Sequence, residues 1–408
     1  MGSRGDERED QGAAMKNGWQ TKPLGDLCKV IGGGTPPKDK AKYYSGDIPW
    51  ATVRDMRSEV IVETECKITK EAVRSSATNI IPKGNVVIAT RVGLGKVCLL
   101  GQDTAINQDL RGIVPIDPKV LSVRFLFWWL KNIADVIVAE GTGATVQGVK
   151  LPFVKSLQIP LPPLPEQQRI VGILDKAFEG IATAKANAEK NLQNARALFE
   201  SHLQSVFTQR EEGRKQKTLE QVATTFGRGK SKHRPRNAKK LYGGIYPFIQ
   251  TGDIRNANHL ITQYSQTYSE AGLAQSKLWP KGTICITIAA NIAETGILGF
   301  DACFPDSVIG VVLNPKEADI GFVEYLLQSF KVRLQAKGKG SAQANINMGT
   351  FENERFPFPS VTEQKRIVAT IDALREEIRR LESLYERKLA VLEELKKSLL
   401  KQAFNGEL

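Results

Sequence analysis

The chain contains a long internal repeat. The segment Glu166–Val171 returns as Glu363–Val368, at an offset of 197 residues (363 − 166). The alignment continues without a gap to Phe207 and Phe404, and 14 of the 42 aligned positions (166 to 207) are identical. A tandem duplication gives one chain two-fold character, and duplex DNA is a common two-fold object that such a chain can bind. The repeat therefore favours two copies of one architecture.

The two copies alternate β-rich and helical segments. The predicted segments are a β-rich domain at 16–162, a helix at 163–212, a second β-rich domain at 213–360 and a helix at 361–408. The β-rich segments repeat each other at an offset near 198, so that Pro82-Lys83-Gly84 matches Pro280-Lys281-Gly282 and Asp55 falls at Asp253. Matching frameworks with different residues between them indicate two copies of one fold whose ligand-facing loops differ.

Both helical segments carry the a/d pattern of a coiled coil. The pattern slips at the same place in each copy, to Leu192 and Leu389, which predicts that the two helices pair in a fixed register. Alanine dominates the first seam, whereas Leu and Tyr dominate the second. The 42 aligned residues, at about 1.5 Å each, give a rod of about 63 Å, and spacing alone could be its function. The expected core residues are Ile170, Leu174, Ile181, Ala188, Leu192, Ile367, Ile371, Ile378, Tyr385 and Leu389.

The net charge of +13 favours a polyanionic partner, with nucleic acid as the first candidate. A membrane is not expected, because no apolar run approaches the roughly 20 residues that a spanning helix needs. The segment Leu121–Leu130 is apolar but short, and it is expected to form a buried helix. Five scattered cysteines without C-x-x-C spacing and three dispersed histidines predict reduced thiols in a cytoplasmic protein and no metal site.

The first residues are polar and charged and lack the apolar stretch of a signal peptide. Met15, followed by Lys16-Asn17-Gly18-Trp19, resembles a natural start. We therefore expect residues 1–15 to be a disordered N-terminal extension.

The densest positive run lies at 228–240, where seven of thirteen residues are Lys or Arg. Such a loop can contact DNA phosphates or can remain a solvated basic loop. We predict phosphate contact, and the milder basic loop at 32–44 would act in the same way in the first copy. The glycine-rich stretches 141–147 and 338–345 could present N–H groups and amides to DNA, or could form tight turns.

The candidate DNA contacts are chosen by residue type in these loops and near the matched positions of the two copies. They are Thr35, Lys38, Lys40, Lys42, Tyr43, Tyr44, Thr52, Arg54, Arg91, Thr142, Gln147, Arg228, Lys230, Lys232, Arg234, Arg236, Lys240, Gln250, Thr251, Arg255, Asn291, Lys339, Ser341, Gln343 and Asn345.

Sequence motifs of common catalytic sites are missing. The chain has no Walker A sequence, no Gly-x-Ser-x-Gly elbow and no Asn-Pro-Pro-aromatic or Asp-Pro-Pro-aromatic tetrapeptide of amino-methylating enzymes. No catalytic residue is therefore expected. Two alternatives stay open: a stand-alone DNA-processing enzyme with an unrecognised active site, and a coiled-coil scaffold that binds only protein.

The order and repetition of several motifs make residues 16–408 resemble the specificity subunit of type I restriction–modification systems. The motifs that carry the resemblance are Gly33-Gly34-Thr35-Pro36, Gly46-Asp47-Ile48-Pro49-Trp50, the run 141–148, the segment 159–167 and the tail 402–408. The second half departs from the pattern, with Gly227-Arg228-Gly229-Lys230 in place of the Gly-Thr-Pro motif and Phe248 in place of the Trp.

The resemblance implies an α/β (α+β) chain with two repeated target-recognition domains, joined by two long antiparallel coiled-coil helices with pseudo-two-fold symmetry. Each domain would read one half-site of a bipartite target in double-stranded DNA. The helices would set the gap and dock two methyltransferase (M) subunits, with restriction (R) subunits outside. The implied docking residues are Glu166, Gln167, Arg169, Glu363, Gln364 and Arg366.

The resemblance also implies a noncatalytic chain that binds no cofactor itself. S-adenosylmethionine would belong to the partner methyltransferase subunits, which modify adenine N6. ATP and Mg²⁺ would belong to the partner restriction subunits.

Overall fold

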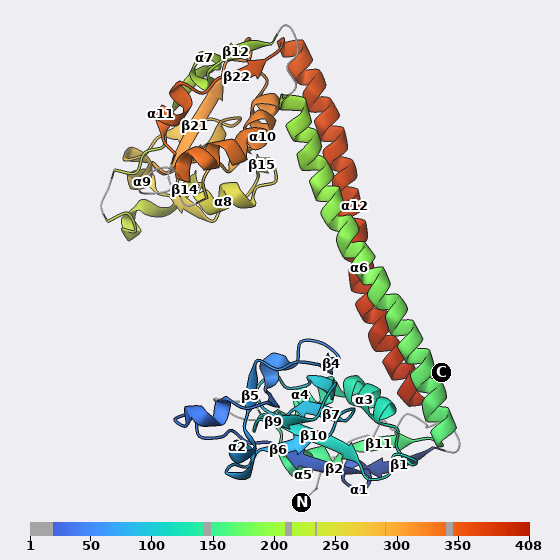
Figure 1. The fold of residues 1–408 in the computed structure, drawn as a ribbon. Coiled ribbons are helices and arrows are strands. Elements are labelled where there is room, and N and C mark those ends of the chain that lie inside the picture. Colours follow the sequence, from blue (N-terminus) through green and yellow to red (C-terminus); the bar gives the residue numbers. More distant parts are fainter. Residues whose placement is uncertain (1–18, 142–147, 209–213, 233–234, 290, 340–345) are drawn as a thin grey trace, which may run out of the picture. The chain divides into compact units, whose positions relative to one another are not determined.

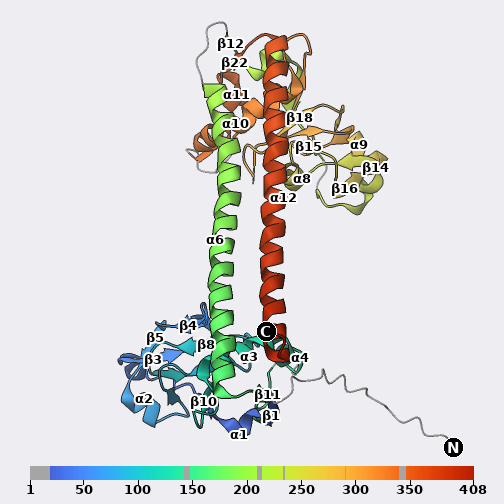
Figure 2. The same cartoon turned by 90° about the vertical axis from the view of Figure 1, so that its right-hand side faces the viewer.

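The structure is a computed structural model that describes residues 19–408 except 142–147, 209–213, 233–234, 290 and 340–345. The expected extension at 1–15 lies outside the described residues. The chain divides into a first unit of Met1–Ala188 with Arg387–Leu408, and a second unit of Glu189–Glu386. Each unit contains one β-rich domain and parts of two long helices (Figures 1 and 2).

The first domain precedes the first long helix and contains two sheets and a two-stranded ribbon. The five-stranded sheet has the order β2 (Cys28–Gly32), β10 (Leu110–Pro115), β7 (Val86–Ala89), β8 (Val97–Leu100) and β4 (Val60–Ile61). The four-stranded sheet has the order β5 (Cys66–Ile68), β3 (Ile48–Ala51), β9 (Thr104–Ile106) and β6 (Asn79–Ile81). The ribbon pairs β1 (Gln20–Pro23) with β11 (Gln158–Leu161). The short helices are α1 (Leu24–Leu27), η1 (Ala41–Tyr44), η2 (Val53–Asp55), α2 (Lys70–Arg74), α3 (Val123–Asn132), α4 (Ala134–Ala139) and α5 (Leu151–Ser156).

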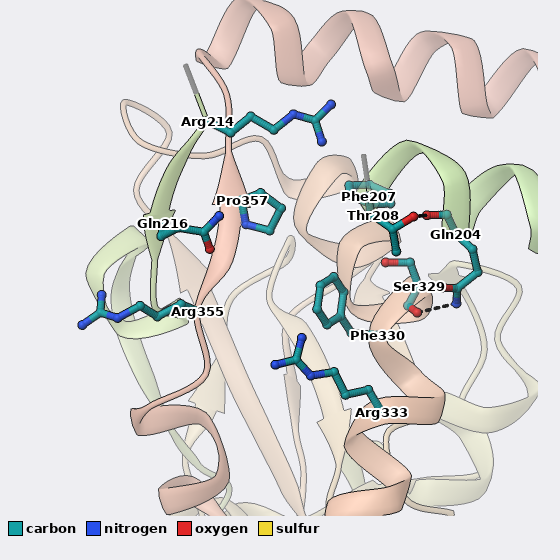
Figure 3. A pocket seen from close by; sticks show the side chains of 10 residues that line it. All are labelled: Gln204, Phe207, Thr208, Arg214, Gln216, Ser329, Phe330, Arg333, Arg355 and Pro357. Atoms are coloured by element: carbon teal, nitrogen blue, oxygen red, sulfur yellow. Dashed lines mark hydrogen bonds between the residues drawn. The ribbon is translucent and has the colours of Figure 1, made fainter. Parts of the chain in front are cut away.

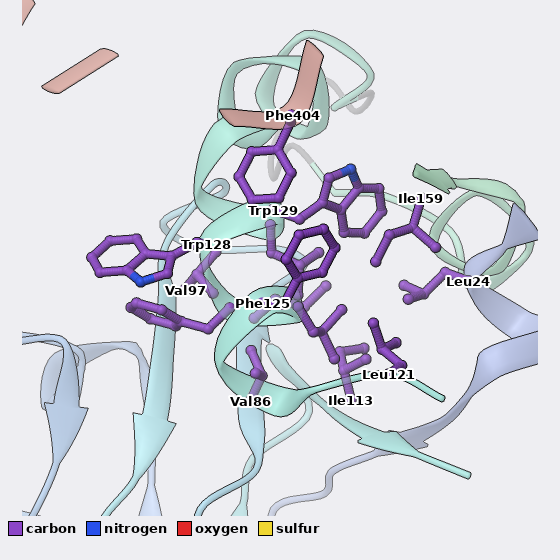
Figure 4. Close-up of a cluster of buried hydrophobic side chains, with 14 of the residues drawn as sticks. Leu24, Val86, Val97, Ile113, Leu121, Phe125, Trp128, Trp129, Ile159 and Phe404 are labelled. Carbon is purple, nitrogen blue, oxygen red and sulfur yellow. The ribbon is translucent and has the colours of Figure 1, made fainter. Parts of the chain in front are cut away.

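The core of the first unit lies on both faces of the five-stranded sheet. Strands β7 and β8 are buried throughout, because alternate residues point into two different clusters. Val86 and Val97 pack against α3, whose residues 125–130 are all buried, as expected for this apolar run. Phe404 from the C-terminal helix packs on Phe125 of α3 with ring centroids 5.1 Å apart (Figure 4). The opposite face carries Val87 and its neighbours in a second cluster.

The second domain repeats this strand order, which confirms the predicted fold class of two repeated mixed domains. Its five-stranded sheet has the order β13 (Ala223–Arg228), β21 (Val308–Leu313), β18 (Ile284–Thr287), β19 (Thr295–Leu298) and β15 (Leu260–Ile261). Its four-stranded sheet has the order β16 (Gln266–Tyr268), β14 (Tyr242–Phe248), β20 (Ala302–Cys303) and β17 (Leu278–Trp279). The ribbon pairs β12 (Lys215–Lys217) with β22 (Phe356–Phe358). The shorter helices are α7 (Leu219–Val222), η3 (Lys239–Leu241), α8 (Thr251–Asn256), α9 (Glu270–Ala274), α10 (Ile320–Lys339) and α11 (Met348–Glu352).

The four-stranded sheets of the two domains pair equivalent residues in the same register. Trp50 of β3 lies opposite Ala105 of β9, and Phe248 of β14 lies opposite Cys303 of β20, in parallel pairing each time. Phe248 thus occupies the place of Trp50. Gly46 lies four residues before Trp50, and Gly244 lies four residues before Phe248. Neither position has room for a side chain, because a Cβ there would lie 2.1 Å (Gly46) or 2.4 Å (Gly244) from a backbone oxygen of the neighbouring strand.

The two long helices are α6 (Leu164–Thr208) and α12 (Val361–Asn405), with 45 residues each. They run antiparallel in each unit. In the first unit Lys185 of α6 pairs with Glu393 of α12 at 2.7 Å, and in the second unit Arg196 of α6 pairs with Glu382 of α12 at 2.7 Å.

The predicted coiled-coil residues are all at least partly buried, and those near the helix starts are buried in the clusters of the two domains. Ile170, Leu174, Ala188, Ile367, Ile371 and Ile378 are buried, and Ile181, Leu192, Tyr385 and Leu389 are half-buried. Asn191 and Lys388, which would continue an unbroken heptad, are exposed. The side-chain pattern thus has the same slip in both helices.

Candidate nucleic-acid interface

A groove of about 360 Å³ in the first domain gathers four of the predicted DNA contacts. Thr35 and Lys38 come from the loop after β2, whereas Thr52 and Arg54 come from the turn after β3. Lys38 offers an ammonium and Arg54 a guanidinium, which are groups that donate hydrogen bonds to phosphates and base edges. Arg54 is exposed.

Asp55 braces the turn that carries Thr52 and Arg54. Its carboxylate accepts hydrogen bonds from the Thr52 N–H at 2.7 Å, the Thr52 hydroxyl at 3.0 Å and the Glu65 N–H at 2.8 Å. Thr52 Oγ1 in turn accepts the Arg54 N–H at 3.2 Å. The hydroxyl proton of Thr52 is therefore already donated, and Arg54 extends from a fixed backbone.

The second domain uses the same brace with different neighbours. Asp253 accepts hydrogen bonds from the Gln250 N–H at 2.8 Å and from the Ser265 hydroxyl at 3.3 Å. Gln250 and Thr251 are half-buried at the start of α8. Arg255 lies on the same short helix and donates to the Asn291 side chain at 3.5 Å. The structure thus brings these four predicted contacts near one another.

Three polar residues of the first groove were missed by the sequence analysis. Asn107, Gln108 and Asp109 follow β9 directly and line the groove. The Thr35 hydroxyl donates to the Gln108 side chain, and Arg91, a predicted contact, lies 3.7 Å from Asp109. Three successive polar residues after a buried strand were the available sequence signal.

The tyrosines of the first basic loop are structural. Tyr43 is 3% exposed, and Tyr44 packs edge-on against Trp50 and donates its hydroxyl to the Pro36 carbonyl at 2.7 Å. The expected DNA contact does not fit the buried ring of Tyr43. Lys40 and Lys42 are exposed above that ring, and the hydrogen bond to Glu71 raises the pKa of Lys42.

The basic run of the second domain is partly neutralised. Arg228 donates to the Asp306 carbonyl at 2.7 Å, and Arg236 pairs with the Asp306 carboxylate at 2.8 Å. Lys230, Lys232 and Lys240 are exposed. Lys277 was missed by the sequence analysis: its ammonium lies 3.7 Å from the Trp279 ring centroid, and partial burial together with Lys230 lowers its pKa.

Several predicted contacts lie outside the described residues. They are Thr142, Gln147, Arg234, Ser341, Gln343 and Asn345, and the side chain of Lys339 is likewise not described.

The predicted docking residues divide into two kinds. Glu166 and Arg169 form a two-bond ion pair, with distances of 2.7 and 2.9 Å, and Glu363 and Arg366 repeat it at 2.9 and 2.7 Å. Arg169 and Arg366 are exposed. Gln167 and Gln364 are 0% exposed, so the expected docking role does not fit them, because a buried side chain cannot meet a partner surface.

A cavity of about 650 Å³ in the second unit contains none of the predicted contacts. Its lining includes Arg214, Arg333 and Arg355, but their guanidinium groups point in different directions (Figure 3). Arg333 pairs with the Glu354 carboxylate at 2.8 Å. The arrangement therefore does not form a convergent anion site.

Within the described ranges, no helix is long and apolar enough to cross a membrane. Those ranges also contain no group of three or more His, Cys, Asp or Glu side chains that could hold a metal ion.

A family model described as "Type I restriction modification DNA specificity domain" matches residues 16–193 and 211–388. The type I restriction enzyme EcoR124I/EcoR124II specificity subunit of Escherichia coli is 35% identical over 177 residues, which are 41% of this chain and 43% of that protein. The MjaIX specificity subunit of Methanocaldococcus jannaschii is 30% identical over 186 residues, 45% of this chain and 43% of that protein. The chain thus aligns with less than half the length of these two relatives. The MjaVIII specificity subunit of the same archaeon is 24% identical and aligns with 96% of this chain and 92% of its own length.

Two solved structures share the fold. One, from work on complex assembly and conformational transition of the type I R-M system, matches with a TM-score of 0.80 and 20% identity, over 97% of this chain and 100% of that chain. The HsdS subunit from Thermoanaerobacter tengcongensis matches with a TM-score of 0.64 and 20% identity, over 98% of this chain and 99% of that chain. At this identity the likeness concerns the fold.

Proposed function

This chain belongs to the family of type I restriction modification DNA specificity domains, and on that premise we propose that it is the DNA-reading specificity subunit of a type I restriction–modification complex. Each of its two domains reads one half-site of a bipartite target in double-stranded DNA. The observation that carries the proposal is the pair of Asp-braced turns, at Asp55 and Asp253, in two family domains of one chain.

The braced turns support base reading because their frameworks match while their exposed residues differ. The first turn presents Arg54, whereas the second presents Arg255 beside Asn291. Arginine binds guanine bidentately, and asparagine or glutamine binds adenine in the same way. Two different residue sets on one scaffold therefore suit two different half-sites.

Exposed lysines of the two basic loops contact phosphates and fix the register of each domain on the duplex. Lys38 serves the first domain, and Lys230, Lys232 and Lys240 serve the second. Such contacts hold the protein in place without carrying sequence information.

The chain is noncatalytic in this proposal and works through partners. Helices α6 and α12 set the gap between half-sites and dock two methyltransferase subunits, and restriction subunits bind outside these. The exposed arginines Arg169 and Arg366, each paired with a half-buried glutamate, support docking at the helix starts. S-adenosylmethionine, ATP and Mg²⁺ belong to the partner subunits. The five free cysteines fit a reducing compartment such as the cytoplasm.

The test is single-molecule sequencing of DNA from cells that express this chain with its methyltransferase subunit. The proposal expects a split motif methylated at adenine on both strands. The purified chain alone, with Mg²⁺ or S-adenosylmethionine, should leave DNA unchanged. Cleavage or methylation by the chain alone would support the stand-alone enzyme instead.

A further inference from the structure

A buried glutamine joins each domain to its long helix at the same repeat position. Gln167 and Gln364 differ by the repeat offset of 197 residues (364 − 167), and both are 0% exposed. A buried amide is costly unless each of its polar groups is bonded. The partners of these amides therefore show what the residues hold together.

In the first unit the Gln167 amide bonds three separate segments. Its oxygen accepts the N–H of Ser122, the residue before α3, at 2.9 Å. Its nitrogen donates to the carbonyls of Val120 and Pro162, both at 2.9 Å. Val120 belongs to the domain, and Pro162 belongs to the proline-rich entry to α6. The side chain thus fixes the domain, the entry segment and α6 at one point.

The second unit repeats the arrangement. The Gln364 oxygen accepts the N–H of Asp319, the residue before α10, at 2.8 Å. Its nitrogen donates to the carbonyl of Pro359 at 2.9 Å and to that of Glu317 at 3.4 Å. The partners are backbone groups at equivalent places, so the contact does not depend on the side chains that differ between the copies.

A second anchor lies farther along each helix. Asp175, eight residues after Gln167 (175 − 167), accepts the Trp128 indole N–H at 2.7 Å. In the other unit Asp372, eight residues after Gln364 (372 − 364), accepts the Tyr325 hydroxyl at 2.5 Å. At 1.5 Å rise per residue the two anchors are about 12 Å apart along the helix. One anchor would permit rotation of the domain about it, but two separated anchors resist that rotation.

The same domain helices also contact the other long helix in each unit. Phe125 of α3 meets Phe404 of α12 at 5.1 Å, and Phe322 of α10 meets Phe207 of α6 at 5.3 Å between ring centroids. These contacts attach each domain to both long helices, at two points on one helix and at one or more points on the other.

We propose that Gln167 and Gln364 are positioning residues that fix the direction in which each recognition domain faces from its helices, and that they thereby restrict the gap length the protein accepts between half-sites. The attachment within each unit stands on the contacts alone. Its effect on the gap rests on the proposed function.

The attachment is tested in the full chain by spin labels on Cys66 and at Glu179→Cys, both exposed positions of the first unit. The other four cysteines are buried, and burial raises the pKa of Cys28 to about 12 and that of Cys98 to about 11, so they react slowly. Gln167→Met keeps the side-chain volume but removes every hydrogen bond of the amide. We expect the distance distribution measured by electron–electron double resonance to broaden or split.

Two control variants test whether the effect is specific to Gln167, one at its neighbour and one at the equivalent residue of the other copy. Gln168→Met changes the exposed neighbour on α6, and Gln364→Met changes the equivalent residue of the other unit, so both should leave the first-unit distances unaltered. If Gln167→Met fails to fold, Asp175→Ala removes the second anchor from a half-buried position and should broaden the same distances. An unaltered distribution in a folded Gln167→Met protein overturns the attachment role.

The gap is tested with the methyltransferase complex on DNA that carries both half-sites at the natural gap or at one base pair more or less. Gln167→Met should raise methylation of the altered gaps relative to the natural gap and leave the half-site sequences unchanged. Broadened distances with an unchanged gap profile overturn the positioning role. Absence of methylation by the unsubstituted complex would count against the proposed function, while the label distances would still decide the attachment.

Discussion

Asp55 and Asp253 each stabilise a turn in their domain, while the residues around them differ. Each carboxylate bonds the backbone of its turn, at Thr52 in one domain and at Gln250 in the other. Because the brace uses backbone donors, the neighbouring side chains can change without loss of the turn. The same scaffold can therefore carry different exposed side chains, Arg54 in the first domain and Arg255 beside Asn291 in the second.

Substitution of Arg54 should affect one half-site only. Arg54→Ala removes an exposed guanidinium from the groove of the first domain. A good bidentate contact to a base discriminates by about 1–3 kcal/mol, so the methylated motif should relax at one position of one half-site. Arg74→Ala, an exposed arginine of α2 that does not line this groove, is the matched control. Relaxation of both half-sites would contradict the assignment.

Removal of three exposed lysines from the second basic loop should change the salt dependence of DNA binding and leave the sequence preference unaltered. The triple variant Lys230→Gln, Lys232→Gln and Lys240→Gln removes three exposed cations from a loop, residues 228–240, that contains no Asp or Glu. Each lost phosphate contact reduces the magnitude of the negative slope of log K against log salt by about 0.9, so that magnitude should fall by about 2 to 3. Binding of the complex to target and nontarget DNA at several salt concentrations measures it. An equal slope would favour a solvated loop.

Residue type in the sequence selected some residues that line a groove, but it did not predict which side chains are exposed. Lys38 and Arg54 were assigned from type and line a groove, but Tyr43, assigned in the same way, is buried. The family resemblance implied that Gln167 lies on a docking surface. Its burial depends on backbone groups that lie 45 residues away in the sequence, at Ser122, and no local pattern reveals them.

The long helices distribute charge unequally between them. Lys185 and Glu382 are equivalent by the repeat (382 − 185 = 197), and so are Arg196 and Glu393 (393 − 196 = 197). Helix α6 therefore supplies both cations, and α12 supplies both acids. Alanines on α6 and larger residues on α12 add a difference in size. Unequal charge and size favour pairing of α6 with α12 over pairing of like helices.

Charge reversal should show whether these pairs stabilise the helices. Lys185→Glu places two acids opposite each other in the first unit and should increase hydrogen exchange in the last turns of α12. The double variant Lys185→Glu with Glu393→Lys should restore protection. The partners are about half exposed, so solvent screening limits the coupling to about 0.2–1 kcal/mol. Failure of the double variant to recover would show that the pair contributes nothing.

Element type and helix register were well predicted from periodicity. The shared slip at Leu192 and Leu389 appears as half-buried residues beside exposed Asn191 and Lys388. Strand order could not be predicted, because the parallel pairing of β3 with β9 joins residues that lie 55 apart, such as Trp50 and Ala105 (105 − 50). Because of the duplication, the strand order of one domain is nevertheless enough to predict the strand order of the other.

At the scale of the whole chain, duplication permits two recognition surfaces on one framework. Both domains keep the strand order, the Asp brace and the buried glutamine, although their basic loops and exposed polar residues differ. The repeat and the family resemblance predicted this organisation. Sequence could not predict which polar side chains line the groove, since Asn107 and Gln108 come from a strand end far from Thr35 in the chain.

The central claim is that each domain reads one half-site independently. The most direct measurement is the methylation motif produced when residues 16–160 are exchanged for the recognition domain of another family member, in complex with the methyltransferase subunits. The account predicts that one half-site changes while the other half-site stays as it was. A change in both half-sites would contradict it.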